Sequence, residues 1–101
     1  MSEIISVNGV PVRLPEERWL HITEGHPELA GHYYEVLETV AQPDWVFEGD
    51  KEALLAVRKI QANKYLVVVY KETGLNDGFI ITAFLTKKIK RLKKRHKIWP
   101  Q

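Results

Sequence analysis

Three consecutive runs of strand-forming residues constrain the fold of this chain more than any other feature. The runs at residues 65–71 and 79–86 are rich in β-branched and aromatic residues, which pack well on a pleated sheet. Residues 54–60 have a composition that also suits a helix, but the polar turn at residues 61–63 favours a hairpin with the next run. A shorter run lies at residues 45–48. Because short connections usually join neighbouring antiparallel strands, we expect a meander of about four strands.

Two helices are expected before these strands. Pro15 and the two glutamates after it begin the first helix, since proline fits the first turn and carboxylates there interact favourably with the helix dipole. Gly25 can end this helix in a left-handed cap. Pro27 begins the second helix, which we expect to run to about Ala41 because its apolar residues recur at helical spacing. Residues 3–13, around Asn8-Gly9, predict a small hairpin or an extended entry segment.

The fold class expected from this order is α+β, in a single domain that spans residues 1–101. Two N-terminal helices would pack on one face of a roughly four-stranded antiparallel sheet. The chain has no cysteine, which excludes disulfides, thiolate catalysis and cysteine zinc sites. Its start does not resemble a signal peptide, and its longest apolar run, residues 65–70, is too short to cross a bilayer. We therefore expect a cytoplasmic protein that does not interact with membranes.

The charge distribution is strongly asymmetric. All 13 acidic residues lie before residue 87, whereas eight of the 15 basic residues, including Lys88 and Arg91, lie after residue 86. The segment 87–97 is expected to be a short basic helix or a solvated arm, which Ile89 and Leu92 could anchor to the body. Such a segment suits the RNA backbone, with Lys88 and Arg91 as phosphate ligands, but it suits an acidic partner protein equally well.

Two histidines near the helix junction are the strongest candidates for chemistry. RNA cleavage without a metal needs a base for the 2′-hydroxyl, an acid for the leaving oxygen, and donors for the developing charge. His21 and His26 titrate near neutrality and could exchange these protons, although each could instead serve the helix interface or the helix cap. His32 is expected at the surface, and His96 is expected to add charge to the basic segment. The four histidines show no helical metal-ligand spacing, so we expect neither a metal site nor a cofactor.

Other candidates lie on the predicted strands. By strict alternation on the last strand, Thr82 and Thr86 share a face with Ile80 and Phe84, and could bind phosphate. Thr82 could equally be an ordinary strand residue, and Thr86 could cap a helix that begins at Lys87.

Three residues of the middle strands complete the set of candidates. Arg58 could clamp a phosphate and Lys64 could neutralise one, although a solvent-facing role suits both residues. Tyr70 could stack on a base, but core packing is the favoured interpretation.

Taken together, these motifs resemble the phage-associated branch of the barnase/EndoU/colicin/RelE-like nuclease superfamily. The resemblance covers residues 18–100. It rests on His21-Ile22, His26-Pro27-Glu28, Pro43-Asp44, residues 65–69, residues 79–84 and Trp99-Pro100 in this order.

The resemblance implies two helices on a four-stranded antiparallel sheet and RNA cleavage, commonly by a toxin or effector that a partner protein silences. It implies active residues at His21, at Arg58 or Lys64, and at Thr82, with His26 in the helix-junction motif. Relatives often carry a basic residue where this chain has Gly25.

The resulting functional hypothesis is a metal-independent endoribonuclease with catalytic residues His21, His26, Thr82 and Arg58. It would be a toxin of a toxin–antitoxin pair or a phage-type effector. RNA would be the substrate, an antitoxin protein a possible partner, and a 2′,3′-cyclic phosphate the product. Two alternatives remain open: an RNA- or ribosome-binding module without catalysis, and an interaction domain that docks an acidic protein through its basic tail.

Overall fold

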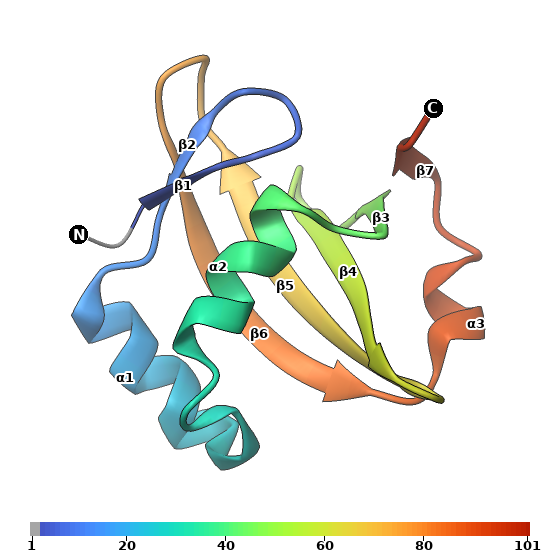
Figure 1. Cartoon of the computed structure of the whole chain (residues 1–101). Helices are drawn as coiled ribbons and strands as arrows, with labels where there is room; N and C mark the ends of the chain where they lie inside the picture. Colours follow the sequence, from blue (N-terminus) through green and yellow to red (C-terminus); the bar gives the residue numbers. More distant parts are fainter. Residues whose placement is uncertain (1–2) are drawn as a thin grey trace.

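The computed structural model describes residues 3–101, which form an α+β fold as expected (Figure 1). The elements follow in the order β1 (Glu3–Ile5), β2 (Pro11–Arg13), α1 (Glu16–Gly25), the 3-10 helix η1 (Pro27–Leu29), α2 (Tyr33–Ala41), β3 (Trp45–Glu48), β4 (Leu54–Gln61), β5 (Lys64–Glu72), β6 (Gly78–Thr86), α3 (Ile89–Leu92) and β7 (Lys97–Trp99).

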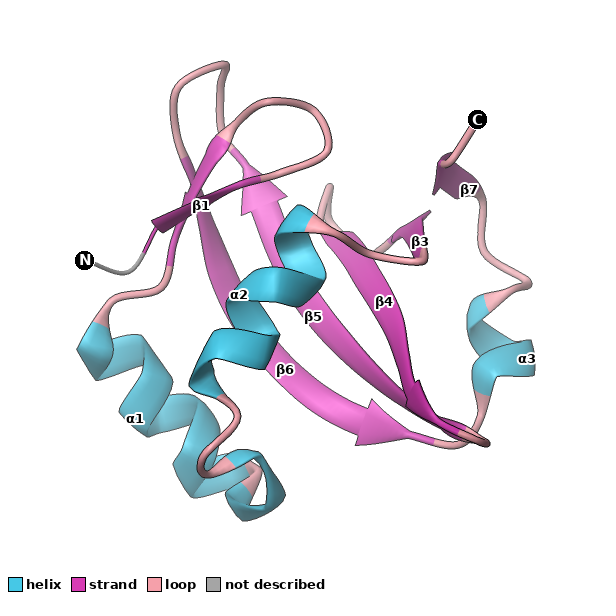
Figure 2. Ribbon diagram, viewed as in Figure 1, coloured by secondary structure: helices cyan, strands magenta, loops and turns pink. Residues whose placement is uncertain are grey.

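All strands belong to one mixed sheet with the order β1-β2-β6-β5-β4-β3-β7. The central strands β3 to β6 form the expected antiparallel meander. Three short strands enlarge the sheet beyond the four predicted from the sequence: β1 and β2 form a hairpin at one edge, and β7 pairs with β3 at the other. Because β2 runs parallel to β6, the sheet is mixed rather than antiparallel throughout. Figure 2 shows α1 and α2 together on one side of the sheet, with α3 and β7 at the edge far from β1.

The two long helices differ in how well their bounds match the prediction. Helix α1 begins directly after Pro15 and ends at Gly25, as predicted. Its end is not a left-handed glycine cap, however, since the chain leaves the helix in an extended conformation at His26. The predicted second helix is divided into η1 and α2, because Gly31 adopts a φ of +87° that no right-handed helix can accommodate.

Two apolar clusters hold the layers together, one on each face of the sheet. The larger cluster lies between the helices and the sheet and includes Ile22, Leu29, Val36, Val40, Leu66, Tyr70, Ile80 and Ala83. The smaller cluster, around Phe47, Leu55, Tyr65 and Val67, lies on the opposite face and is packed by Ile89 and Leu92 of α3. The basic segment is therefore folded onto the sheet through these two residues, as their spacing predicts, and is not a solvated arm.

A β-bulge in β6 changes which residues share a face. Val69 pairs with Thr82, but Tyr70 pairs with Ile80, so Ile81 has no partner residue on β5. The bulge reverses the alternation along the strand. Ile80 and Ala83 therefore both pack toward the helices, whereas the sequence-based alternation had placed them on opposite faces.

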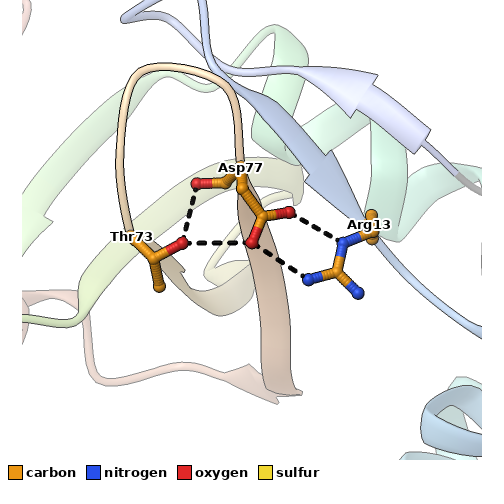
Figure 3. A network of polar contacts seen from close by, with 3 residues as sticks. All are labelled: Arg13, Thr73 and Asp77. Atoms are coloured by element: carbon orange, nitrogen blue, oxygen red, sulfur yellow. Dashed lines mark hydrogen bonds and ion pairs between the residues drawn. The ribbon is translucent and has the colours of Figure 1, made fainter.

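A polar clamp fastens the N-terminal hairpin to the loop between β5 and β6 (Figure 3). Arg13 of β2 donates two hydrogen bonds to the carboxylate of Asp77, at 2.9 and 3.1 Å, and the Thr73 hydroxyl also donates to this carboxylate at 3.1 Å. These bonds lower the pKa of Asp77, with the Arg13 hydrogen bond as the largest cause. Next to the clamp, a β-carbon at Gly78 would lie 2.7 Å from the Lys71 carbonyl oxygen, so only glycine allows this close approach of β2, β5 and β6.

Among residues 3–101, no helix combines the length and the apolar character needed to cross a membrane.

Candidate functional site

A shallow hollow of about 300 Å³ lies where α1 meets β6. Three of the residues singled out in the sequence, His21, His26 and Thr82, line it together. The hollow is completed by Arg18, Ile22, Gly25 and Ile81. An early-helix imidazole and a hydroxyl from the last long strand thus reach the same small volume, although more than 50 positions separate them in the chain.

Local structure explains why these side chains converge. Arg18 and His21 are three residues apart on α1 and therefore share one face of the helix. His26 stands at the junction between α1 and η1, where the following proline keeps the backbone extended. Thr82 lies on the part of β6 beyond its pairing with β2, so the strand edge is uncovered there and Thr82 lines the hollow beside α1.

Both histidines of this hollow lie next to a carboxylate. His21 Nδ1 is 4.0 Å from Glu24 Oε1, and 75% of the His21 side chain is exposed. His26 Nδ1 is 3.5 Å from Glu28 Oε2, and 38% of the His26 side chain is exposed. Both rings are therefore accessible from solvent.

Arg18 is the cation of the hollow. Its Nη1 lies 3.5 Å from the Ile81 carbonyl oxygen, which directs the guanidinium across the edge of β6. A guanidinium offers several N–H donors in one plane and matches the geometry of a phosphate. The hollow therefore combines two titratable rings, a hydroxyl and a permanent positive charge.

A second, basic hollow of about 300 Å³ lies farther along β6. Thr86, Lys88 and Arg91, all proposed from the sequence as substrate ligands, line it together with Phe84, Leu92 and Arg95. Phe84 links the two hollows, because its ring centroid lies 6.3 Å from that of His26. The Thr86 hydroxyl accepts a hydrogen bond of 3.0 Å from the Lys88 backbone N–H, which fixes the turn from β6 into α3. Helix α3 begins at Ile89 and not at Lys87, so Thr86 supports this turn without being the helix N-cap.

The other sequence-based candidates lie elsewhere. Arg58 points to the helix side of the sheet, where it forms an ion pair of 2.5 Å with Glu38 of α2. Lys64 is the first residue of β5 and, by alternation with Leu66, lies on the helix side as well. The structure therefore does not bring Arg58 or Lys64 to the two histidines.

Tyr70 is a core residue, which agrees with the favoured interpretation of the sequence. Its side chain has no exposed surface, and its hydroxyl has no hydrogen-bond partner among residues 3–101. Burial, and to a lesser extent the nearby charge of Glu72, raises the pKa of Tyr70 well above the usual tyrosine value. A ring in this position has no free face on which a base could stack.

Sequence reasoning missed two residues that border the hollows, Arg18 and Phe84. Arg18 could have been found from its spacing of three residues before His21 on a predicted helix. No local signal marks Phe84, since an aromatic residue in a strand indicates a core position in the first instance.

Comparison with known proteins leaves the chain without an assigned family: no protein-family model matches it, and neither a curated protein nor a solved structure matches it significantly.

Proposed function

We propose that this protein is a metal-independent endoribonuclease of the toxin type, which cleaves RNA by attack of its 2′-hydroxyl and leaves a 2′,3′-cyclic phosphate. The observation that carries the proposal is the shared hollow of His21, His26, Thr82 and Arg18. These side chains cover the requirements of the reaction: a base, an acid, a hydrogen-bond donor and a fixed positive charge.

The chemical roles follow from the residue types. One imidazole takes the proton of the 2′-hydroxyl while the other protonates the leaving 5′-oxygen, so the two rings must be in opposite protonation states when the reaction starts. The oxygen of the nucleophile forms a bond to phosphorus as the bond to the 5′-oxygen breaks. Thr82 donates to a non-bridging oxygen of the phosphorane, and Arg18 offsets its extra negative charge. Because the two histidines act as a pair, kcat/KM should rise and then fall with pH.

The basic hollow extends this site along the RNA. Lys88, Arg91 and Arg95 would bind phosphates on one side of the scissile bond, across Phe84 from the histidines. A toxin of this kind needs an inhibitor during its synthesis, and an antitoxin with an acidic surface would complement the same cations.

The distribution of charge also supports a second candidate function. The cations gather on α3 and its flanks, whereas acidic residues such as Glu17 and Glu24 lie close to His21. This arrangement fits an RNA-binding module that holds a strand at α3 without cutting it. It also fits docking of an acidic protein at α3.

End-labelled RNA incubated in the presence of EDTA separates these functions. We expect the wild-type chain to produce fragments with cyclic-phosphate ends, and His21→Ala and His26→Ala each to reduce the cleavage rate at least about 100-fold. Lys59→Gln is the matched control, since Lys59 is an exposed cation that borders the Arg58–Glu38 pair and does not line the hollow of the histidines. Binding without fragments would support the RNA-binding module, and cleavage by His21→Ala at the wild-type rate would remove His21 from the mechanism.

A further inference from the structure

An apolar trough of about 530 Å³ lies on the sheet face opposite α1 and α2. It shares Ile81 with the hollow of the histidines, and it shares Phe84, Leu92 and Arg95 with the basic hollow. Its apolar lining includes Leu55, Val69, Phe79, Ile81, Phe84 and Leu92. Half-buried aromatic side chains in an open trough are unusual on a surface that serves only to face water.

The trough exists because α3 covers only part of this face. Ile89 and Leu92 pack over the cluster around Phe47 and Tyr65, on the β3 and β4 side of the sheet. The β-bulge in β6 keeps Ile81 and Phe84 on this same face, although they are an odd number of residues apart. The half of the face formed by β5 and β6 is thereby left open.

The rim of the trough is predominantly positive. Lys51, Lys71 and Arg95 surround it, and Asp50 is the one acidic side chain among its lining residues. Asp50 is already engaged by Arg95, whose Nη1 lies 3.3 Å from the carboxylate. An apolar, partly aromatic floor with a cationic rim matches a flat aromatic group that is attached to an anionic backbone.

We propose that this trough binds an unstacked nucleobase of single-stranded RNA, with the base against Phe84 and the adjoining phosphates held by Lys88, Arg91 and Arg95. The inference rests on the proposed function, because it takes RNA as the ligand, and it adds that the RNA bound is single-stranded. A base can reach Phe84 only if it is splayed out of its stack, which a single strand or loop permits and a continuous duplex does not. Because the His26 ring lies 6.3 Å from the Phe84 ring, the bound nucleotide would be a near neighbour of the scissile phosphate.

Binding of oligonucleotides that cannot be cut tests the inference separately from catalysis. A fluorescent 2′-O-methyl octanucleotide lacks the nucleophilic hydroxyl and therefore cannot be cut. Its affinity, measured by fluorescence anisotropy at constant salt, is compared with the affinities of an abasic octamer and of a blunt duplex of the same sequence. We expect the single strand to bind about tenfold more tightly than the abasic octamer, since stacking on an aromatic side chain contributes this much per base. We expect Phe84→Leu to abolish that preference and to leave binding of the abasic octamer unchanged, whereas Phe84→Trp retains the preference.

Tyr34→Leu is the matched control, because Tyr34 is an exposed aromatic residue on α2. Equal binding of the single strand and the abasic octamer by the wild-type chain would overturn the inference without any variant, and so would a preference that survives Phe84→Leu. Concentration-dependent dimerisation that Phe84→Leu abolishes would identify a second copy as the occupant of the trough and would likewise overturn it. If the chain cleaves RNA in a His21-dependent way but shows no preference for an oligonucleotide with bases, only the proposed nucleobase site in the trough is refuted. If it shows this preference but does not cleave RNA, only the proposed nuclease activity is refuted.

Discussion

Thr82 is the hydroxyl-bearing residue of the hollow that contains both histidines. It lies on the part of β6 that β2 does not cover, so the strand edge is open there beside α1. Valine has the same shape and β-branching as threonine, so Thr82→Val removes only the hydroxyl. We expect kcat for RNA cleavage to fall about tenfold or more with KM nearly unchanged, because the donor is needed mainly for the phosphorane.

The thermal midpoint provides the control for Thr82→Val. A half-buried strand position should tolerate valine, so the midpoint should stay within a few degrees of the wild-type value. An unchanged kcat would show that the hydroxyl does not contact the reacting phosphate.

At the scale of the elements, the parallel contact between β2 and β6 depends on Gly78. Gly78→Ala would place a β-carbon 2.7 Å from the Lys71 carbonyl oxygen and 3.3 Å from that of Pro11. We expect a loss of about 1–3 kcal/mol in the free energy of unfolding, measured by urea denaturation, because the backbones must move apart. Gly74→Ala is the matched control, since a β-carbon there meets no atom within 4 Å. Equal stability of the two variants would contradict this account of the strand junction.

The clamp between Arg13 and Asp77 makes the same region sensitive to acid. Since its pKa is lower in the folded chain than in the unfolded chain, the Asp77 carboxylate contributes stability above the ordinary aspartate pKa near 3.8, and this contribution is lost as the pH falls through the folded-state value. We expect the free energy of unfolding to fall less steeply for Asp77→Asn than for the wild-type chain between about pH 5 and pH 2. Parallel pH profiles of the two proteins would show that the clamp does not contribute.

At the scale of the whole molecule, the separation of charge predicts how RNA binding depends on salt. Deleting residues 87–101 is an unsuitable test, because it would also remove the apolar contacts of α3 and the pairing of β7 with β3. The double variant Lys88→Gln/Arg91→Gln keeps these contacts and removes two charges of the basic hollow. We expect the slope of log K against log salt concentration to decrease by about 0.7 for each phosphate contact that is lost on a single strand.

Lys59→Gln again serves as the control for this measurement, since it removes one exposed charge that lines neither the hollow of the histidines nor the basic hollow. An unchanged slope in the double variant would indicate that the basic hollow serves a protein partner and not RNA.

The sequence by itself determined the local elements of this protein. The meander β3 to β6 and helix α1 lie where hydrophobic periodicity, turn residues and the proline start signal predict them, because these preferences act over a few neighbouring residues. Side-chain chemistry and the family resemblance singled out His21, His26 and Thr82, which the structure brings to one hollow.

The tertiary structure decided how distant segments meet. The pairing of β2 with β6 and the position of Arg18 beside Thr82 depend on contacts between residues more than 60 positions apart, and the bulge at Ile81 depends on the pairing of β6 with β5. The ion pair that holds Arg58 on the helix side, away from the histidines, also arises only when α2 packs on β4. Short-range propensity carries no information about such pairings, because their energy comes from burial and hydrogen bonds that form only once the sheet and the helices are assembled.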